Sequence, residues 1–170
     1  GSAVVFESAA VTYLAPVFDD ANNKTVIAFR SGTTVEAIVG TVSGTGISFG
    51  TKVQASSSAS HASCTYDTGK VVIAYSDNSA SAHGKAVVGT ISGTSISFGS
   101  PTTFNAAGTE FTTPVFNSLS NKVGIAFRDQ ASANGRLVNG TVSGTSITFA
   151  SATTFASATL QQGAVYDPDG

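Results

Sequence analysis

The sequence predicts an all-β fold built from tandem repeats, and two observations support this prediction. The hexapeptide Gly-Thr-(Val/Ile)-Ser-Gly-Thr occurs three times, at Gly40–Thr45, Gly89–Thr94 and Gly140–Thr145. The copies start 49 and 51 residues apart (89 − 40 and 140 − 89), and a period of this size is typical of propellers and arrays. In addition, Val, Ile and Phe alternate with Ser and Thr, which suits half-buried strands. We expect no helix in the chain.

Each repeat unit is predicted to contain four short antiparallel strands. The first strand lies at Ala15–Phe18, Ser63–Tyr66 and Thr113–Phe116 and once more at Ala164–Tyr166, and a turn rich in Asp and Asn follows it. The second strand lies at Lys24–Phe29, Lys70–Tyr75 and Lys122–Phe127. It is nearly all apolar, which predicts burial on both faces. The third strand contains the start of the hexapeptide, and the Gly of its Ser-Gly-Thr part suits a tight turn to the fourth strand. The fourth strand, with one wet face, lies at Gly46–Phe49, Ser95–Phe98 and Ser146–Phe149.

The repeat frame divides one domain, residues 1–170, into three complete units and two partial ones. The boundaries are 1–12, about 13–60, 61–110 and 111–160, and 161–170. Extended segments at Ala3–Phe6, Pro101–Phe104 and Ala152–Phe155 mark the ends of units. Four antiparallel strands in about 50 residues make a β-propeller blade, so we favour a β-propeller-like array. The alternative is a β-trefoil. The trefoil accounts for the number of complete units, three, whereas the propeller accounts for the doubly buried second strand and the partial units.

Composition argues against several classes of protein. Only 11% of the residues are charged and the net charge is −2. The Lys and Arg residues are scattered, whereas nucleic-acid binding normally needs a basic face. No apolar run is long enough for a membrane helix, so we expect no membrane insertion. A single cysteine, Cys64, excludes an internal disulfide, and we find no motif for a cofactor or metal.

The repeat resembles those of a known group of proteins. The segment Val-Gly-Thr-Ile-Ser-Gly-Thr-Ser-Ile-Ser-Phe-Gly-Ser at 88–100 looks like tandem repeats in phage tail-fibre-like proteins and in large secreted or surface proteins of aquatic microbes and viruses, and the segment at Tyr66–Tyr75 fits the same pattern. The resemblance covers almost the whole chain. It implies an adhesive module that is extracellular or on the virion surface, and it implies no defined catalytic motif.

Catalysis is not expected from the residues present. General acid–base hydrolysis needs a placed pair of carboxylates, and the acidic residues fall mostly in turns. A sialidase-like triad from Arg30, Arg128 and Arg136 fails because Arg136 has a different place in its repeat. His61 and His83 lie in different kinds of segment and are expected to have no shared role. We therefore predict that the chain is not an enzyme.

Ligand binding is expected instead at the loop between the second and third strands. This loop varies most between the units, and variable loops on a rigid scaffold commonly carry function. Its polar side chains lie beside an aromatic residue, a mixture that suits sugar hydroxyls. The predicted ligand-binding residues are Arg30, Tyr75, Asp77, Asn78, His83, Arg128, Asp129, Gln130 and Asn134.

Three functions remain open on the sequence. The first is a non-enzymatic binding or adhesion module that recognises surface glycans, with several weak sites acting by avidity. The second is a structural spacer or assembly repeat without a ligand, and the third is a glycosidase-like fragment. Unpaired strand edges at the terminal partial units also predict self-association.

Overall fold

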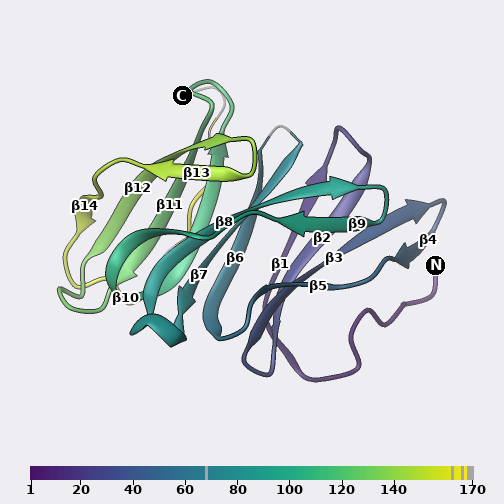
Figure 1. Ribbon diagram of the computed structural model, residues 1–170, viewed down its shortest axis with the longest axis horizontal. Helices are drawn as coiled ribbons and strands as arrows, with labels where there is room; N and C mark the ends of the chain where they lie inside the picture. The colour runs from purple at the N-terminus through teal and green to yellow at the C-terminus, as the bar shows by residue number, and fades with distance from the viewer. Residues whose placement is uncertain (68, 162, 166, 168–170) are drawn as a thin grey trace.

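The computed structural model describes residues 1–67, 69–161, 163–165 and 167, and fourteen strands form three repeat units (Figure 1). Unit 1 contains β1 (Val11–Asp19), β2 (Lys24–Ser31), β3 (Thr34–Ser43), β4 (Gly46–Phe49) and β5 (Val53–Ser56). Unit 2 contains β6 (Ala59–Asp67), β7 (Lys70–Asp77), β8 (His83–Ser92), β9 (Ser95–Phe98) and the start of β10 (Thr102–Asn117). Unit 3 contains the rest of β10, β11 (Lys122–Asp129), β12 (Gly135–Ser143), β13 (Ser146–Phe149) and β14 (Thr153–Ala156).

All strand pairs within a unit are antiparallel. In unit 1 the order is β1-β2-β3, and both β4 and β5 pair with β3. Strand β10 belongs to two units, because its first half pairs with β8 and its second half with β11. The segment 3–6, predicted to be extended like its counterparts, forms no strand.

The units stand side by side in chain order, from unit 1 on the right of Figure 1 to unit 3 on the left. The all-β, antiparallel prediction is confirmed. No sheet closes on itself within the described residues, so the closed propeller stays a prediction and the barrel of a trefoil is not seen in this part of the chain. The described residues contain no α-helix, and their one helical element is a single turn of 3₁₀-helix, Asn78–Ala80, which Asp77 caps by accepting a hydrogen bond from the Ser79 amide.

Neighbouring units pack face to face. We call the face that meets the next unit the front face (Val26 and Ala28 in unit 1) and the opposite one the back face (Ile27 and Phe29). The front of unit 1 and the back of unit 2 bury one cluster: Val26, Ala28, Val35, Ala37, Val39, Ala59, Ala62, Cys64, Val71, Ile73, Tyr75, Val87, Ile91 and Ile96. Units 2 and 3 bury the second: Val72, Ala74, Ala86, Val88, Val123, Ile125, Phe127, Val138 and Ile147.

Unit 2 is the one unit of the described chain with a neighbouring unit on each face. Every residue of β7 from Val71 to Asp77 is therefore buried, as predicted for the second strand. In β2, by contrast, Thr25 and Ile27 on the back face are only half-buried. The burial of a strand in this protein follows the number of units packed against it.

The first Gly of the hexapeptide makes room for the fourth strand. A Cβ atom at Gly89 would lie 2.7 Å from Cδ1 of Ile96 and 2.8 Å from Cε1 of Phe98. The Ile and Phe side chains of β9 can reach the back face only because this Cβ is missing. Gly40 and Gly140 are crowded by the matching side chains of β4 and β13.

Two other hexapeptide residues fix the hairpin of the third and fourth strands and join it to the second strand. The Thr hydroxyl after the first Gly accepts a hydrogen bond from the Lys Nζ that starts the second strand. These bonds join Lys24 to Thr41, Lys70 to Thr90 and Lys122 to Thr141 at 2.9, 2.8 and 2.6 Å. The second Gly adopts a left-handed φ, +62° at Gly93, which a tight hairpin requires.

The last Thr of the hexapeptide touches the preceding unit. A Cβ at Gly50 would lie 1.9 Å from the carbonyl oxygen of Thr94, and one at Gly99 would lie 2.0 Å from that of Thr145. Neither Gly has a left-handed φ, so the constraint at these positions is the close approach of two backbones. Glycine after the fourth strand therefore sets how closely two units can stack.

We predict that Gly99→Ala destabilises the protein by about 1–3 kcal/mol, the usual cost of overpacking. For a chain of this size, that corresponds to a fall in Tm of about 2–4 °C per kcal/mol. Gly46→Ser is the matched control, because positions 95 and 146 of the other units carry Ser. The free energy of unfolding from urea titration checks both variants. Equal stability of Gly99→Ala and the parent would contradict the packing argument.

Candidate functional site

The first strands of the three units carry a β-bulge at the same place. Their strand registers shift between Thr12 and Ala15 in β1, between Ser60 and Ser63 in β6, and between Glu110 and Thr113 in β10. The residues at the three bulges have left-handed φ angles of 53°, 50° and 51°, and they are Tyr13, His61 and Phe111. Positive φ is uncommon for bulky side chains, and bulges re-aim side chains.

The three bulge side chains meet across the units. The ring of His61 lies 5.1 Å from that of Tyr13 and 4.9 Å from that of Phe111, centroid to centroid. They line a hollow of about 270 Å³, which we call the central hollow. Its lining residues are Tyr13, His61, Ala62, Ser63, Phe111, Thr112, Thr113 and Gln161. Gln161 is one repeat further along the chain, so four successive repeat positions converge here.

His61 sits in the middle of this row, and its surroundings favour the neutral form by lowering its pKa. Partial burial lowers its pKa and the nearby positive charge of Arg30 lowers it further, although the carboxylate of Glu110 raises it in part. The Nδ1 atom of His61 and the Nε atom of Arg30 are buried without a hydrogen-bond partner. Buried polar atoms of this kind are rare and call for an explanation.

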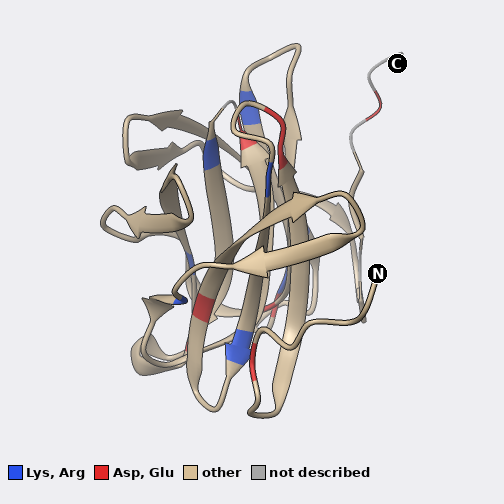
Figure 2. Cartoon of the chain, turned by 90° about the vertical axis from the view of Figure 1, so that its right-hand side faces the viewer, with Lys and Arg blue, Asp and Glu red and all other residues tan. Residues whose placement is uncertain are grey.

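A charged layer borders the central hollow where β10 meets β11. Arg128 forms an ion pair with Glu110, and Gln130 Nε2 donates a 3.0 Å hydrogen bond to the same carboxylate. Arg128 Nε also donates to the carbonyl of Thr159 at 2.7 Å. Burial raises the pKa of Glu110, but the hydrogen bonds from Gln130 and Arg128 outweigh it and hold the pKa below its ordinary value. Elsewhere charges are few and scattered (Figure 2).

The structure places the loop residues that the sequence predicts in unit 2 around internal contacts. Tyr75 is buried in the core between units 1 and 2. Asp77 accepts hydrogen bonds from the amide and hydroxyl of Ser79 at 3.0 and 2.6 Å and pairs with Lys85 Nζ at 2.7 Å. Asn78 accepts from the Ser60 hydroxyl at 3.1 Å. His83 begins β8 and lies opposite Asp77 in the strand register.

The matching loop of unit 3 is arranged in the same way. Asp129 accepts hydrogen bonds from the amides of Ala131 and Ser132 at 3.0 and 3.1 Å and contacts Arg136 Nη1 at 3.3 Å. The carbonyl of Asn134 accepts from the Asp129 amide at 2.9 Å. These groups hold the loop in shape.

Of the nine predicted residues, Arg30, Arg128 and Gln130 interact with residues of the central hollow or beside it. The positive charge of Arg30 lowers the pKa of His61, and the side chains of Arg128 and Gln130 bind the carboxylate of Glu110. Sequence reasoning missed Tyr13, Phe111 and Gln161, and it treated His61 as isolated. The signal that could have found them is position: aligned on the aromatic residue that ends the first strand (Phe18, Tyr66 and Phe116 in the three units), all four occupy the same place in successive repeats.

The only cysteine of the chain has no reactive setting. Cys64 is buried, its Sγ lies 3.0 Å from the carbonyl oxygen of Ala15, and burial raises its pKa to about 12. Among the described residues there is no group of three His, Cys, Asp or Glu side chains arranged to hold a metal ion. The same residues include no helix of the length and apolarity needed to cross a membrane.

Comparisons with known proteins leave the site to be interpreted from its geometry. No family model matches the chain, and neither a curated protein nor a solved structure matches it.

We predict that His61 makes the fold less stable as the pH falls from about 7 to 5. The pKa of His61 in the folded chain is lower than its unfolded value of 6.5, so the unfolded chain takes up a proton first. Stability then falls below about pH 6.5 until folded His61 is also protonated. Asp77 and Asp129 have lowered pKa values and lose their contributions only below about pH 4.

The measurement is the free energy of unfolding at pH 7 and pH 5. His61→Phe gives unit 2 the residue that unit 3 carries at Phe111, and in this variant the loss of stability over the interval should shrink. The control His83→Gln should keep the full loss. An unchanged pH dependence in His61→Phe would show that His61 is not the responsible group.

Proposed function

We propose that this chain is a non-enzymatic binding and adhesion module of a secreted or virion-surface protein and that it binds a carbohydrate in the central hollow. The observation that supports this most is the convergence of three bulges on one hollow. A left-handed φ costs about 1–3 kcal/mol at each bulky residue. Such strain is typical of functional sites, and here Tyr13, His61 and Phe111 carry it at the one place where their rings meet.

The lining of the central hollow fits one sugar ring. A sugar presents an apolar C–H face and hydroxyl groups at its edge, and aromatic rings beside polar groups suit both. Tyr13 and Phe111 supply aromatic surface, while Ser63 and Gln161 supply hydrogen-bonding groups of the lining. The volume of about 270 Å³ lies just below the usual range of about 300–1,000 Å³ for ligand sites, which favours a monosaccharide unit over a long chain.

The arrangement of carboxylates supports binding over hydrolysis. A glycosidase uses two carboxyl groups, one of them with a raised pKa that lets it act as an acid. Glu110 borders the central hollow, but Arg128 and Gln130 bind it and its pKa is lowered. A carboxylate held in this way is poorly suited to give up or take a proton.

The second candidate is a structural spacer without a ligand. It is favoured by the loops, whose carboxylates at Asp77 and Asp129 bind their own backbone and a neighbouring Lys or Arg. On this view the three bulge rings only pack the inner strands against one another. The two candidates differ in one measurable respect, because only the first predicts that the folded chain binds a ligand.

We predict that Gln161→Ala and Tyr13→Ala each weaken carbohydrate binding about tenfold, the effect of losing more than 1 kcal/mol at a contact residue. Both side chains are exposed enough to be removed without opening the core. The control is Leu119→Ala, on the exposed turn between β10 and β11. A glycan array would find a ligand and calorimetry would measure Kd. A blank array with folded protein would favour the spacer, and equal loss in Leu119→Ala would remove the central hollow as the site.

A further inference from the structure

The back face of unit 1 is exposed to solvent at positions that are buried in unit 2. Leu14 is 50% exposed, whereas Ala62 at the same place in unit 2 is 5% exposed. Likewise Val42 is 53% exposed, and its counterpart Ile91 is 8% exposed. The repeat supplies its own control, because the same face is buried wherever another unit packs against it.

Residues 1–8, which we call the N-terminal strap, occupy part of this face. The ring of Phe6 lies 5.2 Å from that of Phe29 and 5.8 Å from that of Phe49. Between units 2 and 3, the first part of β10 makes the same contacts: Phe104 lies 5.1 Å from Phe127 and 5.7 Å from Phe149. The N-terminal strap therefore takes the place of one strand of a preceding unit.

The N-terminal strap lies on unit 1 through the ring of Phe6, a close approach of Gly1 to Thr45 and an ion pair. It forms no strand, and its charged contact is an ion pair between Glu7 and the partly exposed Lys52. A hollow of about 380 Å³ remains between the strap and Ile38, Gly50 and Lys52. An ion pair with one solvent-accessible partner stabilises a contact only weakly, so a complete unit would cover this face better than the strap does.

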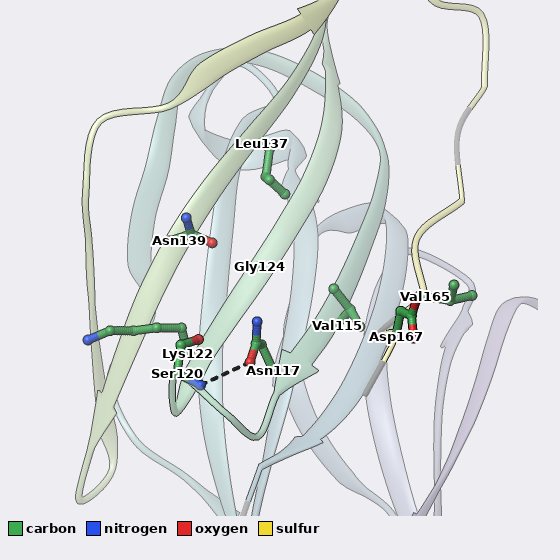
Figure 3. A pocket seen from close by; sticks show the side chains of 9 residues that line it. All are labelled: Val115, Asn117, Ser120, Lys122, Gly124, Leu137, Asn139, Val165 and Asp167. Atoms are coloured by element: carbon green, nitrogen blue, oxygen red, sulfur yellow. Dashed lines mark hydrogen bonds between the residues drawn. The ribbon is translucent and has the colours of Figure 1, made fainter. Parts of the chain in front are cut away.

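The front face of unit 3 is the other bare face (Figure 3). Leu137 and Asn139 are exposed there, where unit 2 has fully buried Ala86 and Val88. A hollow of about 460 Å³ lies between this face and the terminal segment that carries Val165.

The terminal segment, residues 157–167 without 162 and 166, which lie outside the described residues, runs where the first strand of a following unit would lie. It pairs with no strand in its described part. The Thr159 amide donates to the carbonyl of Ala133 at 2.9 Å, as the Thr109 amide donates to Ala82 one unit earlier. Leu160 and Val165 remain largely exposed. Like the N-terminal strap, this segment is a partial substitute for a neighbouring unit.

We propose that the back face of unit 1 binds the front face of unit 3 of a second copy of this chain, head to tail, with displacement of the N-terminal strap and the terminal segment. The two faces are those that already stack twice within the chain. Phe155, 55% exposed, holds the repeat position of Phe6 and Phe104 and would enter the pocket of Phe29 and Phe49. Such contacts are heterologous and build rings or filaments.

One residue limits this association. Ala150 stands where the other units have Gly50 and Gly99, and its amide donates to Asn139 as theirs donate to the matching third strands. A Cβ at Gly50 would lie 1.9 Å from the Thr94 carbonyl, so the methyl group of Ala150 would meet Thr45 of the second copy. The backbones of the two chains must shift apart there, which lowers the affinity of association below the value expected with Gly at position 150.

The test is solution mass against concentration, by multi-angle light scattering, for the full chain and three variants. We expect Ala150→Gly to strengthen association at least tenfold and Glu7→Lys, which repels Lys52 and loosens the N-terminal strap, to strengthen it further. Adding Val42→Glu, which places a charge on the bare face, should return the mass to that of a monomer.

Two results would overturn the proposal. One is a monomeric mass for Ala150→Gly and for its combination with Glu7→Lys up to millimolar concentration, with native circular dichroism. The other is undiminished association after Val42→Glu. Because no ligand is needed, neither result depends on the carbohydrate proposed for the central hollow.

Discussion

The close stacking of one four-stranded unit on the next is the constraint on which the rest of this structure depends. A single small sheet has two faces and cannot bury either by itself, so the hydrophobic clusters form only between units. Two hexapeptide positions serve this stacking directly: Gly89 admits the Ile96 and Phe98 side chains to the back face, and Thr94 meets Gly50 of the preceding unit. What recurs in the sequence is therefore an interface together with the strands that form it.

The strands and turns could be predicted from sequence because their signals are local. Alternation of period two and the Ser-Gly-Thr turn predict hairpins without knowledge of the neighbouring unit. The central hollow could not be predicted in this way. A bulge with a left-handed φ is expected to carry Gly or Asn, whereas these carry Tyr13, His61 and Phe111. Asp77 and Asp129 are predicted ligand-binding residues because of their carboxylates, and in the structure these carboxylates accept hydrogen bonds from backbone amides of their own loops.

Differences between the repeats are coupled through the same interfaces. Phe29 and Phe127 each pack against a Phe from the neighbouring segment. Tyr75 is the larger residue at this position, and the smaller Ala55 packs against its cluster. In unit 3, Gly124 replaces the Val of the other units, and Leu137 replaces their Ala and extends to 3.5 Å from where a Cβ of Gly124 would lie. Such exchanges conserve volume, which cores tolerate best, so the repeats diverge in sequence while the stacking geometry is kept.

Stacking also connects the proposed binding site with the proposed assembly. The bulges of the first strands form a row, and each stacked unit adds one side chain to it. Gln161 of the terminal segment now continues the row after Phe111. If a second copy stacked in the same register and displaced that segment, its Tyr13 would replace Gln161 at this position. The central hollow would then exchange an amide for an aromatic ring, and ligand binding and association would be linked, each changing the affinity of the other by the same factor.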